Sequence, residues 1–282
     1  MSVEINRIEP DSGLRTLRLP TGTLRVLQLT DTHLYADPDG TLLGINTLAS
    51  FEAVLQMVRA ADWQPDLVLA TGDLVHDASP DCYRQLADAL AAFDVPVFCL
   101  PGNHDLPEVM RQHLRNGHVT TAPVQDHGDW RFIMLDSVIP QEPGGHLAQA
   151  QLELLAAALD DSRDHTLVCM HHQPVDVGSA WIDTMTLDNP DALFDVLDGH
   201  DQVRGLLFGH VHQTFDAVRR QVRLMASPST CVQFMPHSDE FQVDREPPGF
   251  RLLALLPDGT IRSEVLRTAD VPHGVELASA GY

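Results

Sequence analysis

The sequence predicts an α/β protein in which two β-sheets pack against each other and helices cover their outer faces. Apolar strand-like segments alternate with helical segments as far as Gly209, which is typical of α/β packing. Beyond Gly209 short β-like stretches dominate, so a β-rich C-terminal part is expected from about residue 210. Polar residues follow several apolar segments directly, at the position where open α/β sheets form their sites.

The alternation begins near the N-terminus. The segments expected to be strands that run into polar loops are "LRVLQLTDTH", "DLVLATGD", "VPVFCLPGNHD", "DWRFIMLDS", "HTLVCMHHQP" and the apolar run before Gly209. Helical spacing predicts one helix over 47–61, with Thr47 as a candidate cap, and another over about 146–159. Ser79 and Pro80 are expected to open a further helix, because proline suits the first helical position.

The C-terminal part is expected to consist of strands. The β-like stretches there are "TFDAVRR", "VRLMASP", "TCVQFM", "GFRLLALL" and "TIRSEVLR". Residues 250–266 are expected to form a hairpin around the turn "PDGT". No repeat, low-complexity tract or linker divides the sequence, so residues 1–282 are expected to form a single domain.

The composition is typical of a soluble cytoplasmic protein. Apolar residues make up 44% of the 282 residues, which is enough for a sizeable core. No stretch approaches the roughly 18 apolar residues of a membrane helix, and the N-terminus lacks the pattern of a secretory signal. The four cysteines are scattered without CxxC spacing, which favours reduced core thiols over a disulfide framework or a cysteine zinc site.

The charge of the chain bears on its partners. The 18 basic residues are all arginine, and the 40 acidic residues bring the net charge to −22. Such a surface repels nucleic acids and anionic membranes, so neither is expected as a partner. A phosphate substrate would need locally concentrated positive charge, which a metal centre can supply.

Two histidines stand two residues apart in "LLFGHVHQTF". Side chains at this spacing point the same way in an extended segment, so His210 and His212 are expected to stand together at the end of a strand. Neutral imidazole is the commonest metal ligand in proteins. Considered alone, the pair is equally consistent with two surface histidines in a chain that has fifteen of them.

Metal-type residues follow four other strand-like segments. They are Asp31 and His33, then Asp73, then Asn103 and His104, and then His171. Each cluster alone is typical of a turn or a helix cap. Their repeated occurrence directly after strands favours a common site at the strand ends. Gly72, Gly102 and Gly209 would let the backbone turn sharply beside that site.

The ordered motifs DxH, GD, GNHD, a histidine after a strand and GHxH resemble those of the calcineurin-like metallophosphoesterases. The stretches "LLGINT", "HTLVCMHHQPV" and "SPSTCVQFMPH" extend the similarity to the class III bacterial 3′,5′-cyclic AMP phosphodiesterases of that family. The resemblance covers nearly the whole chain. It implies a four-layer α/β/β/α sandwich of two mixed sheets and a two-metal centre.

The resemblance also implies the ligands. Asp31, His33, Asp73 and His212 are expected to hold one ion, and Asp73, Asn103, His171 and His210 the other, with Asp73 as the bridge. Of the neighbouring histidines the resemblance implies His171, since the family pattern uses the first, and His172 is not expected to bind as well because adjacent strand residues point to opposite faces. Oxygen and imidazole ligands suit two divalent or trivalent ions per chain, iron and manganese above all, with zinc and cobalt as alternatives.

The implied reaction is hydrolysis of 3′,5′-cyclic AMP to 5′-AMP. His104 is the candidate proton donor to the leaving oxygen, and Asp73 is the second catalytic residue. Asp105 is interpreted either as a carboxylate that orients His104 or as a cap. The residues expected to contact substrate are His33, Asp73, Asn103, His104 and His212.

Two further segments have two interpretations each. Residues 229–237 either line the base pocket or form an ordinary strand and turn. The loop Gly144–His146 is either a structural turn or a part of the site.

The expected partner is a small-molecule cyclic nucleotide, bound by a monomer or a homodimer. The alternatives are a phosphomonoesterase, a phosphodiesterase acting on 2′,3′-cyclic nucleotides, and a non-catalytic metal-binding scaffold. A scaffold should have lost ligands, which this chain retains. A nuclease would need a basic surface, which the net charge argues against.

Overall fold

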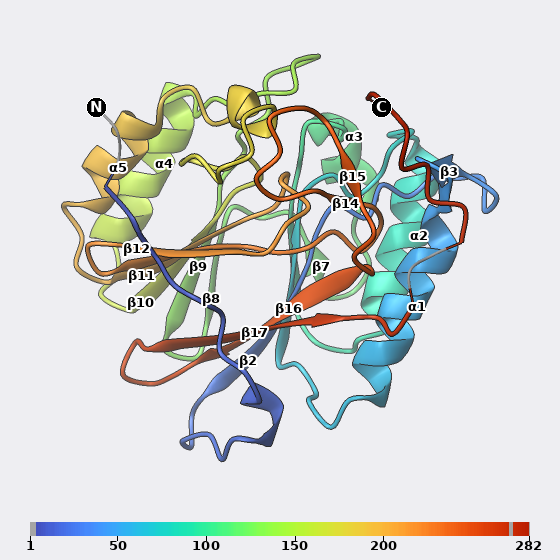
Figure 1. Ribbon diagram of the computed structural model, residues 1–282. Coiled ribbons are helices and arrows are strands. Elements are labelled where there is room, and N and C mark those ends of the chain that lie inside the picture. Colours follow the sequence, from blue (N-terminus) through green and yellow to red (C-terminus); the bar gives the residue numbers. More distant parts are fainter. Residues whose placement is uncertain (1–3, 271–272, 282) are drawn as a thin grey trace.

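Two large mixed sheets form the centre of the computed structural model, which describes residues 4–270 and 273–281 (Figure 1). The six-stranded sheet consists, in spatial order, of β17 (Ile261–Arg267), β16 (Gly249–Leu255), β2 (Leu24–Leu29), β5 (Leu67–Thr71), β6 (Val97–Leu100) and β7 (Val119–Thr120). The seven-stranded sheet consists of β1 (Asn6–Arg7), β12 (Phe215–Arg219), β13 (Val222–Ala226), β11 (Val203–Phe208), β10 (His165–Cys169), β9 (Trp130–Met134) and β8 (Val124–His127). Two short hairpins, β3 (Thr41–Leu42) with β4 (Ile45–Asn46) and β14 (Gln233–Phe234) with β15 (Val243–Asp244), lie outside these sheets.

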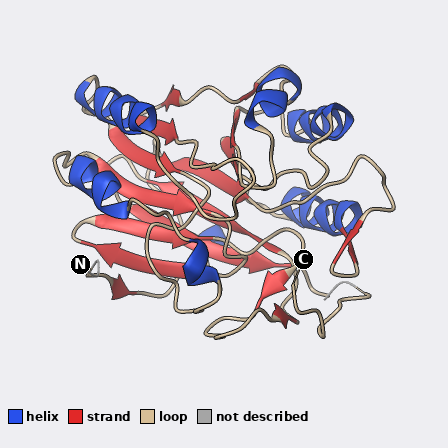
Figure 2. Cartoon of the chain, turned by 90° about the horizontal axis from the view of Figure 1, so that it is seen from above, coloured by secondary structure: helices blue, strands red, loops and turns tan. Residues whose placement is uncertain are grey.

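Helices cover the outer faces of both sheets, and the predicted four-layer sandwich is confirmed. The helices α1 (Thr47–Ala60), α2 (Pro80–Ala91) and α3 (Pro107–His113) pack on the six-stranded sheet, and α4 (Gln149–Asp160) and α5 (Pro190–Leu197) on the other (Figures 1 and 2). Between the sheets lies a separate apolar core that includes Leu69, Phe98, Phe132 and Leu207. Short 3₁₀ helices occur at Leu14–Thr16 (η1) and Ile182–Met185 (η2).

Parallel pairing brings several strand ends to one edge of the sandwich. In the first sheet β2, β5 and β6 run parallel, and in the second β9, β10, β11 and β13 do. Their registers are typified by Leu27 opposite Val68 and by Val168 opposite Leu206. The carboxyl ends of these strands therefore deliver their following loops to neighbouring positions, as the sequence predicts.

The helix boundaries show which local signals were reliable. Ser79 caps α2 as expected, with its side chain accepting a hydrogen bond from the amide of Cys82 at 3.2 Å. The prediction that Thr47 caps α1 is wrong: Asn46 is the cap, accepting from Ala49 N–H at 2.7 Å, and Thr47 is the first helical residue. The helix expected from His146 begins at Gln149, because the chain before it forms a loop.

The cysteines have the surroundings that their scattered spacing predicts. All four are free and buried. Burial raises the pKa of the Cys231 thiol to about 12, so it is neutral at ordinary pH. Among the helices of the described residues, none is both long and apolar enough to cross a membrane.

Candidate metal centre

The predicted site residues lie in the loops that follow five parallel strands of the two sheets. Asp31 and His33 follow β2, Asp73 follows β5, and Asn103 and His104 follow β6. From the second sheet, His171 follows β10, and His210 and His212 follow β11. The two sheets therefore contribute to one cluster of side chains at their shared edge.

The backbone at these residues is not extended, contrary to the geometry expected for His210 and His212. Positive φ angles occur at Asp31 (54°), His33 (44°), Asp73 (49°), His210 (68°) and His212 (49°). Non-glycine residues rarely adopt this left-handed conformation, and such strain is typical of functional sites. Each strand therefore ends before its ligand-type residues, and a tight turn aims their side chains.

Glycines allow the loops to approach one another closely. A Cβ on Gly72 would lie 2.3 Å from His171 Nδ1, and one on Gly102 would lie 2.2 Å from Asp73 Oδ1. Both distances are shorter than any real contact, so a larger residue at either position would displace a site residue. The expected sharp turn is confirmed at Gly72, whose φ is 92°, whereas at Gly102 the glycine allows the close approach.

The first half of the cluster surrounds Asp31. His212 Nε2 lies 3.3 Å from Asp31 Oδ1 and 3.3 Å from His33 Nε2, and His33 Nε2 lies 3.8 Å from Asp73 Oδ2. All four side chains are buried. The backbone amide of His210 donates to both oxygens of Asp31, at 3.1 and 3.2 Å, which fixes the carboxylate.

The second half of the cluster surrounds His171. Its Nε2 lies 3.3 Å from Asp73 Oδ2 and 3.9 Å from Asp31 Oδ1. The ring of His210 lies beside it, with 5.2 Å between the ring centroids. Among the described residues, no hydrogen-bond partner is present for His210 Nε2 or Asn103 Oδ1, although both atoms are buried. Unpartnered buried polar atoms are costly unless a ligand satisfies them.

The charges within the cluster are mutually dependent. Burial opposes the charged form of His171, but the carboxylates of Asp73 and Asp31 outweigh it and raise its pKa to about 9. Burial likewise opposes ionisation of Asp73, yet His171 and His104 hold its pKa well below the usual range. Burial lowers the pKa of His33 and of His210 well below that of free histidine. The carboxylates therefore attract positive charge, and these two rings offer neutral nitrogens.

This donor set fits metal ions. One nitrogen or oxygen per residue lies within 4.8 Å of the others in the group Asp31, His33 and His212 and in the group Asp31, Asp73 and His171. A cation between them would take the place of the proton on His171 and satisfy the unpartnered atoms of Asn103 and His210. Carboxylate, amide and imidazole donors without thiolates suit harder metal ions.

His172 is closer to the site than its expected orientation allows. β10 ends at Cys169, so His171 and His172 lie beyond the strand, where the alternation of faces no longer applies. The His172 ring is 4.8 Å from that of His210, and both side chains are buried. Its Nδ1 lies 2.8 Å from Ser137 Oγ. The expectation that the ring points away from the site is therefore wrong.

Asp105 organises the loops of the site. It accepts hydrogen bonds from Gly102 N–H at 2.9 Å, from Leu74 N–H at 3.1 Å and from the Tyr83 hydroxyl at 3.0 Å. Burial raises its pKa to about 7. These bonds join the loop after β5 to the loop after β6. Asp105 is not the cap of α3, whose N-cap residue is Leu106.

The segment 229–237 supports His212. The carbonyl of Val232 lies 2.8 Å from His212 Nδ1, and the ring of Phe234 stacks on the His212 ring at 4.2 Å. The hydroxyl of Ser229 donates to the carbonyl of Asp31 at 2.7 Å. The contacts thus assign this segment a structural role beneath the site.

A cavity of about 520 Å³ opens beside the cluster. Asn103, His104 and His210 line its inner end. Its other lining residues are Gln141, Glu142, Pro143, Trp181, Ile182, Met185, Phe241, Ala280 and Gly281. The volume lies within the roughly 300–1,000 Å³ of small-molecule sites, and the combination of aromatic and polar walls is typical of them. No sequence motif indicated this wall, because four separated segments build it.

Comparison with known proteins links this geometry to a family. The family model for calcineurin-like phosphoesterases matches residues 24–214. The chain is 43% identical over 258 residues to the 3′,5′-cyclic adenosine monophosphate phosphodiesterase CpdA of Pseudomonas aeruginosa, an alignment that covers 91% of this chain and 94% of the relative. It is 42% identical to CpdA of Escherichia coli K12, over 92% of this chain and 95% of the relative.

Solved structures show the same fold at low sequence identity. A dimetal phosphatase from Danio rerio superimposes with a TM-score of 0.56 at 17% identity, covering 87% of this chain and 99% of the other. Purple acid phosphatase from yellow lupin gives a TM-score of 0.60 at 14% identity, covering 91% of this chain and 53% of the other.

Proposed function

The chain belongs to the calcineurin-like phosphoesterase family, and on that premise we propose that it hydrolyses 3′,5′-cyclic AMP to 5′-AMP at a binuclear metal centre. The observation that carries this proposal is the convergence of two buried carboxylates and several imidazoles from both sheets at one edge. The relatives named as cyclic AMP phosphodiesterases match nearly the whole chain, which extends the proposal from the family to the substrate.

We assign two ions to the cluster. Asp31, His33, Asp73 and His212 would hold one, and Asp73, Asn103, His171 and His210 would hold the other. Asp73 would be shared by both, since its Oδ2 lies 3.3 Å from His171 Nε2 and 3.8 Å from His33 Nε2. Iron and manganese suit these donors best, with zinc and cobalt as alternatives.

Bound metal ions would lower the pKa of a bound water and neutralise the charge of the phosphate. The chain itself is strongly acidic, so the metal ions would be the main source of positive charge at the site. None of the residues named as lining the cavity is arginine, so Asn103 and His104 are the polar side chains proposed to meet the phosphate. In the reaction water adds to phosphorus and gives up a proton, the bond to O3′ breaks, and His104 donates a proton to O3′. The backbone amide of His104 donates to Asp73 Oδ1 at 2.8 Å, which holds the proton donor against the centre.

The cavity is the place for the nucleoside. It begins at Asn103, His104 and His210 and continues to an aromatic wall formed by Trp181 and Phe241, whose ring centroids are 5.0 Å apart. Purine bases stack on aromatic side chains irrespective of sequence context. A phosphate held at the metal centre thus directs the base toward this wall.

The chemistry of the chain supports a proposed cellular setting. Four free buried cysteines suit a reducing compartment, so we place the enzyme in the cytoplasm. The net charge of −22 disfavours nucleic acid as a substrate. A monomer or a homodimer fits a site whose proposed ligands all come from one chain.

A comparison of three substrates tests the function. Metal-loaded protein is assayed with 3′,5′-cyclic AMP, its 2′,3′ isomer and 4-nitrophenyl phosphate at matched concentrations. We expect the highest kcat/KM on the 3′,5′ isomer. A higher value on either of the other two would replace the proposed activity by a phosphodiesterase of 2′,3′-cyclic nucleotides or by a phosphomonoesterase.

A further inference from the structure

His76 lies against the metal centre, three residues after Asp73. The loop after β2 and the loop after β5 remain paired beyond the sheet: His33 N–H donates to Asp73 O at 2.9 Å, and His76 N–H donates to Leu34 O at 2.7 Å. The backbone pairing therefore holds His76 beside His33 independently of how the two imidazole rings are oriented. This pairing could not be foreseen from the sequence, where His76 belongs to no metal motif.

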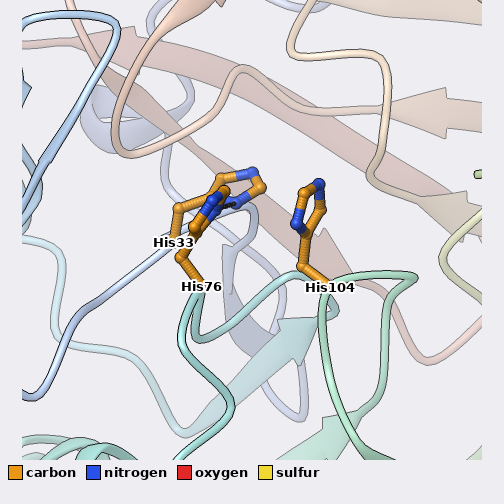
Figure 3. Close-up of side chains that lie close together, drawn as sticks. All are labelled: His33, His76 and His104. Atoms are coloured by element: carbon orange, nitrogen blue, oxygen red, sulfur yellow. Dashed lines mark hydrogen bonds between the residues drawn. The ribbon is translucent and has the colours of Figure 1, made fainter. Parts of the chain in front are cut away.

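The two rings meet through their Nδ1 atoms. His76 Nδ1 and His33 Nδ1 are 3.3 Å apart (Figure 3). At that distance one nitrogen must carry a proton and the other must offer a lone pair. The Nε2 of His33 faces the centre, 3.8 Å from Asp73 Oδ2. If this Nε2 is to bind a metal ion, the proton of His33 has to be on Nδ1, and His76 has to be the acceptor.

In two other proposed ligands the Nδ1 atom faces a backbone carbonyl instead of a side chain. His171 Nδ1 lies 2.9 Å from the carbonyl of Thr71, and His212 Nδ1 lies 2.8 Å from the carbonyl of Val232. A backbone carbonyl cannot be removed by substitution. His33 instead depends on a side chain, which makes the contribution of its acceptor measurable.

We propose that His76 is a positioning residue of the metal centre: its Nδ1 accepts the Nδ1 proton of His33 and so keeps the lone pair of His33 Nε2 directed at the ion. The inference rests on the proposed metal centre but not on the identity of the substrate. Such acceptors behind metal-bound histidines set the tautomer and the ring orientation, and losing one typically weakens metal affinity by about 10- to 100-fold.

The surroundings of His76 suit an acceptor. The His76 side chain is partly buried. Its ring stacks on that of His104 at 4.7 Å with 24° between the planes, and Tyr35 lies 4.9 Å from it. These contacts restrict the rotation of the ring and hold its Nδ1 toward His33 (Figure 3).

Three variants of His76 distinguish the effect of its hydrogen-bond acceptor from the effect of its stacked ring. His76→Asn keeps an acceptor oxygen near the position of Nδ1, His76→Phe keeps the stacking ring without an acceptor, and His76→Ala keeps neither. The affinity of the metal-free proteins for Mn²⁺ is measured by competition with a chelator. We expect a loss of about 10- to 100-fold in His76→Phe and His76→Ala, and near wild-type affinity in His76→Asn.

The control is His200→Phe, because His200 lies three residues beyond the end of α5, with its Nδ1 2.8 Å from Val196 O. Thermal midpoints of the metal-free variants establish that each is folded. Wild-type affinity in His76→Phe, or an equal loss in His76→Asn and His76→Phe, would overturn the acceptor role. Because Mn²⁺ binding needs no turnover, failure of the cyclic AMP assay leaves this result interpretable.

Discussion

Asp73 contacts both halves of the cluster, and its substitution is the residue-scale test of a shared ligand. Its Oδ2 lies near His171 and near His33, while its Oδ1 accepts the amide of His104. We predict that Asp73→Ala lowers the content of both metal ions and abolishes turnover. Elemental analysis of the purified variant measures this. Full occupancy by two ions in that variant would remove Asp73 from the bridging position.

His104 is expected to act on the leaving oxygen alone. We predict that His104→Ala retains its metal ions but loses about 10²–10⁴-fold in kcat on 3′,5′-cyclic AMP, the range typical of general acid catalysis. The loss should be much smaller on bis-4-nitrophenyl phosphate, whose acidic leaving group needs no proton. Rates on the two substrates are compared directly. Equal losses would assign His104 to phosphate binding instead of proton donation.

The residues of the site were largely predictable, because each follows a strand end in an ordered motif. The family resemblance grouped Asp31, His33 and His212 before any geometry was available, and the structure brings one nitrogen or oxygen of each within 4.8 Å of the others. His172 and His76 were not predictable in the same way. The position of His172 depends on where β10 ends, and that of His76 depends on tertiary pairing between two loops.

At the scale of elements, the strands were predicted better than the short helices. The strands β5, β6 and β10 each have an apolar run, whereas α3 and α5 have few residues in which to show a period. Both helices begin with proline, at Pro107 and Pro190, and this signal was the one available for them. The cavity wall was equally difficult to predict from the sequence, since Gln141, Trp181 and Phe241 come from different segments.

A salt bridge links α5 to β12. Asp198 follows the last residue of α5, and its Oδ2 accepts from Arg219 at 2.9 Å and lies 3.0 Å from Arg220. Hydrogen bonding to Arg219 lowers the pKa of Asp198 below its value of 3.8 in an unfolded chain. The stabilisation is therefore fully present above pH 3.8 and is lost as the pH falls through the folded-state pKa.

We predict that Asp198→Asn lowers the free energy of unfolding at neutral pH by at most about 1 kcal/mol, since the pair is partly solvated. The difference from wild type should shrink in acid, once the wild-type carboxyl is itself protonated. Urea unfolding at both pH values measures it. Asp195→Asn, an exposed position on the same helix, is the control. If the difference in the free energy of unfolding persisted unchanged in acid, the charge of Asp198 would not be what stabilises the folded protein.

At the scale of the whole molecule, a buried ion pair joins the two sheets. Arg251 on β16 donates to Asp216 on β12 at 2.7 Å, and the side chains of both are fully buried. Arg251 also donates to Ser263 Oγ at 2.6 Å and to Phe215 O at 3.2 Å. Desolvated charges with satisfied hydrogen bonds tolerate the loss of a partner poorly, because the remaining charge is left buried.

We predict that Arg251→Met lowers the free energy of unfolding by about 3–5 kcal/mol. The double variant Arg251→Met/Asp216→Leu should lose less than the sum of the single variants, since neither member of this buried pair then remains without the other. Denaturant unfolding followed by tryptophan fluorescence gives these values. Additive losses would indicate that the two side chains act independently.

The central claim is that two metal ions act together in the hydrolysis of cyclic AMP. It is tested most directly by following the release of 5′-AMP from 3′,5′-cyclic AMP while Mn²⁺ is titrated into the metal-free protein. We predict little turnover up to one equivalent per chain and full turnover only as the second ion binds, because the proposed ligands of the two sites share Asp73. Full activity with one ion bound, or no 5′-AMP with two, would contradict the claim.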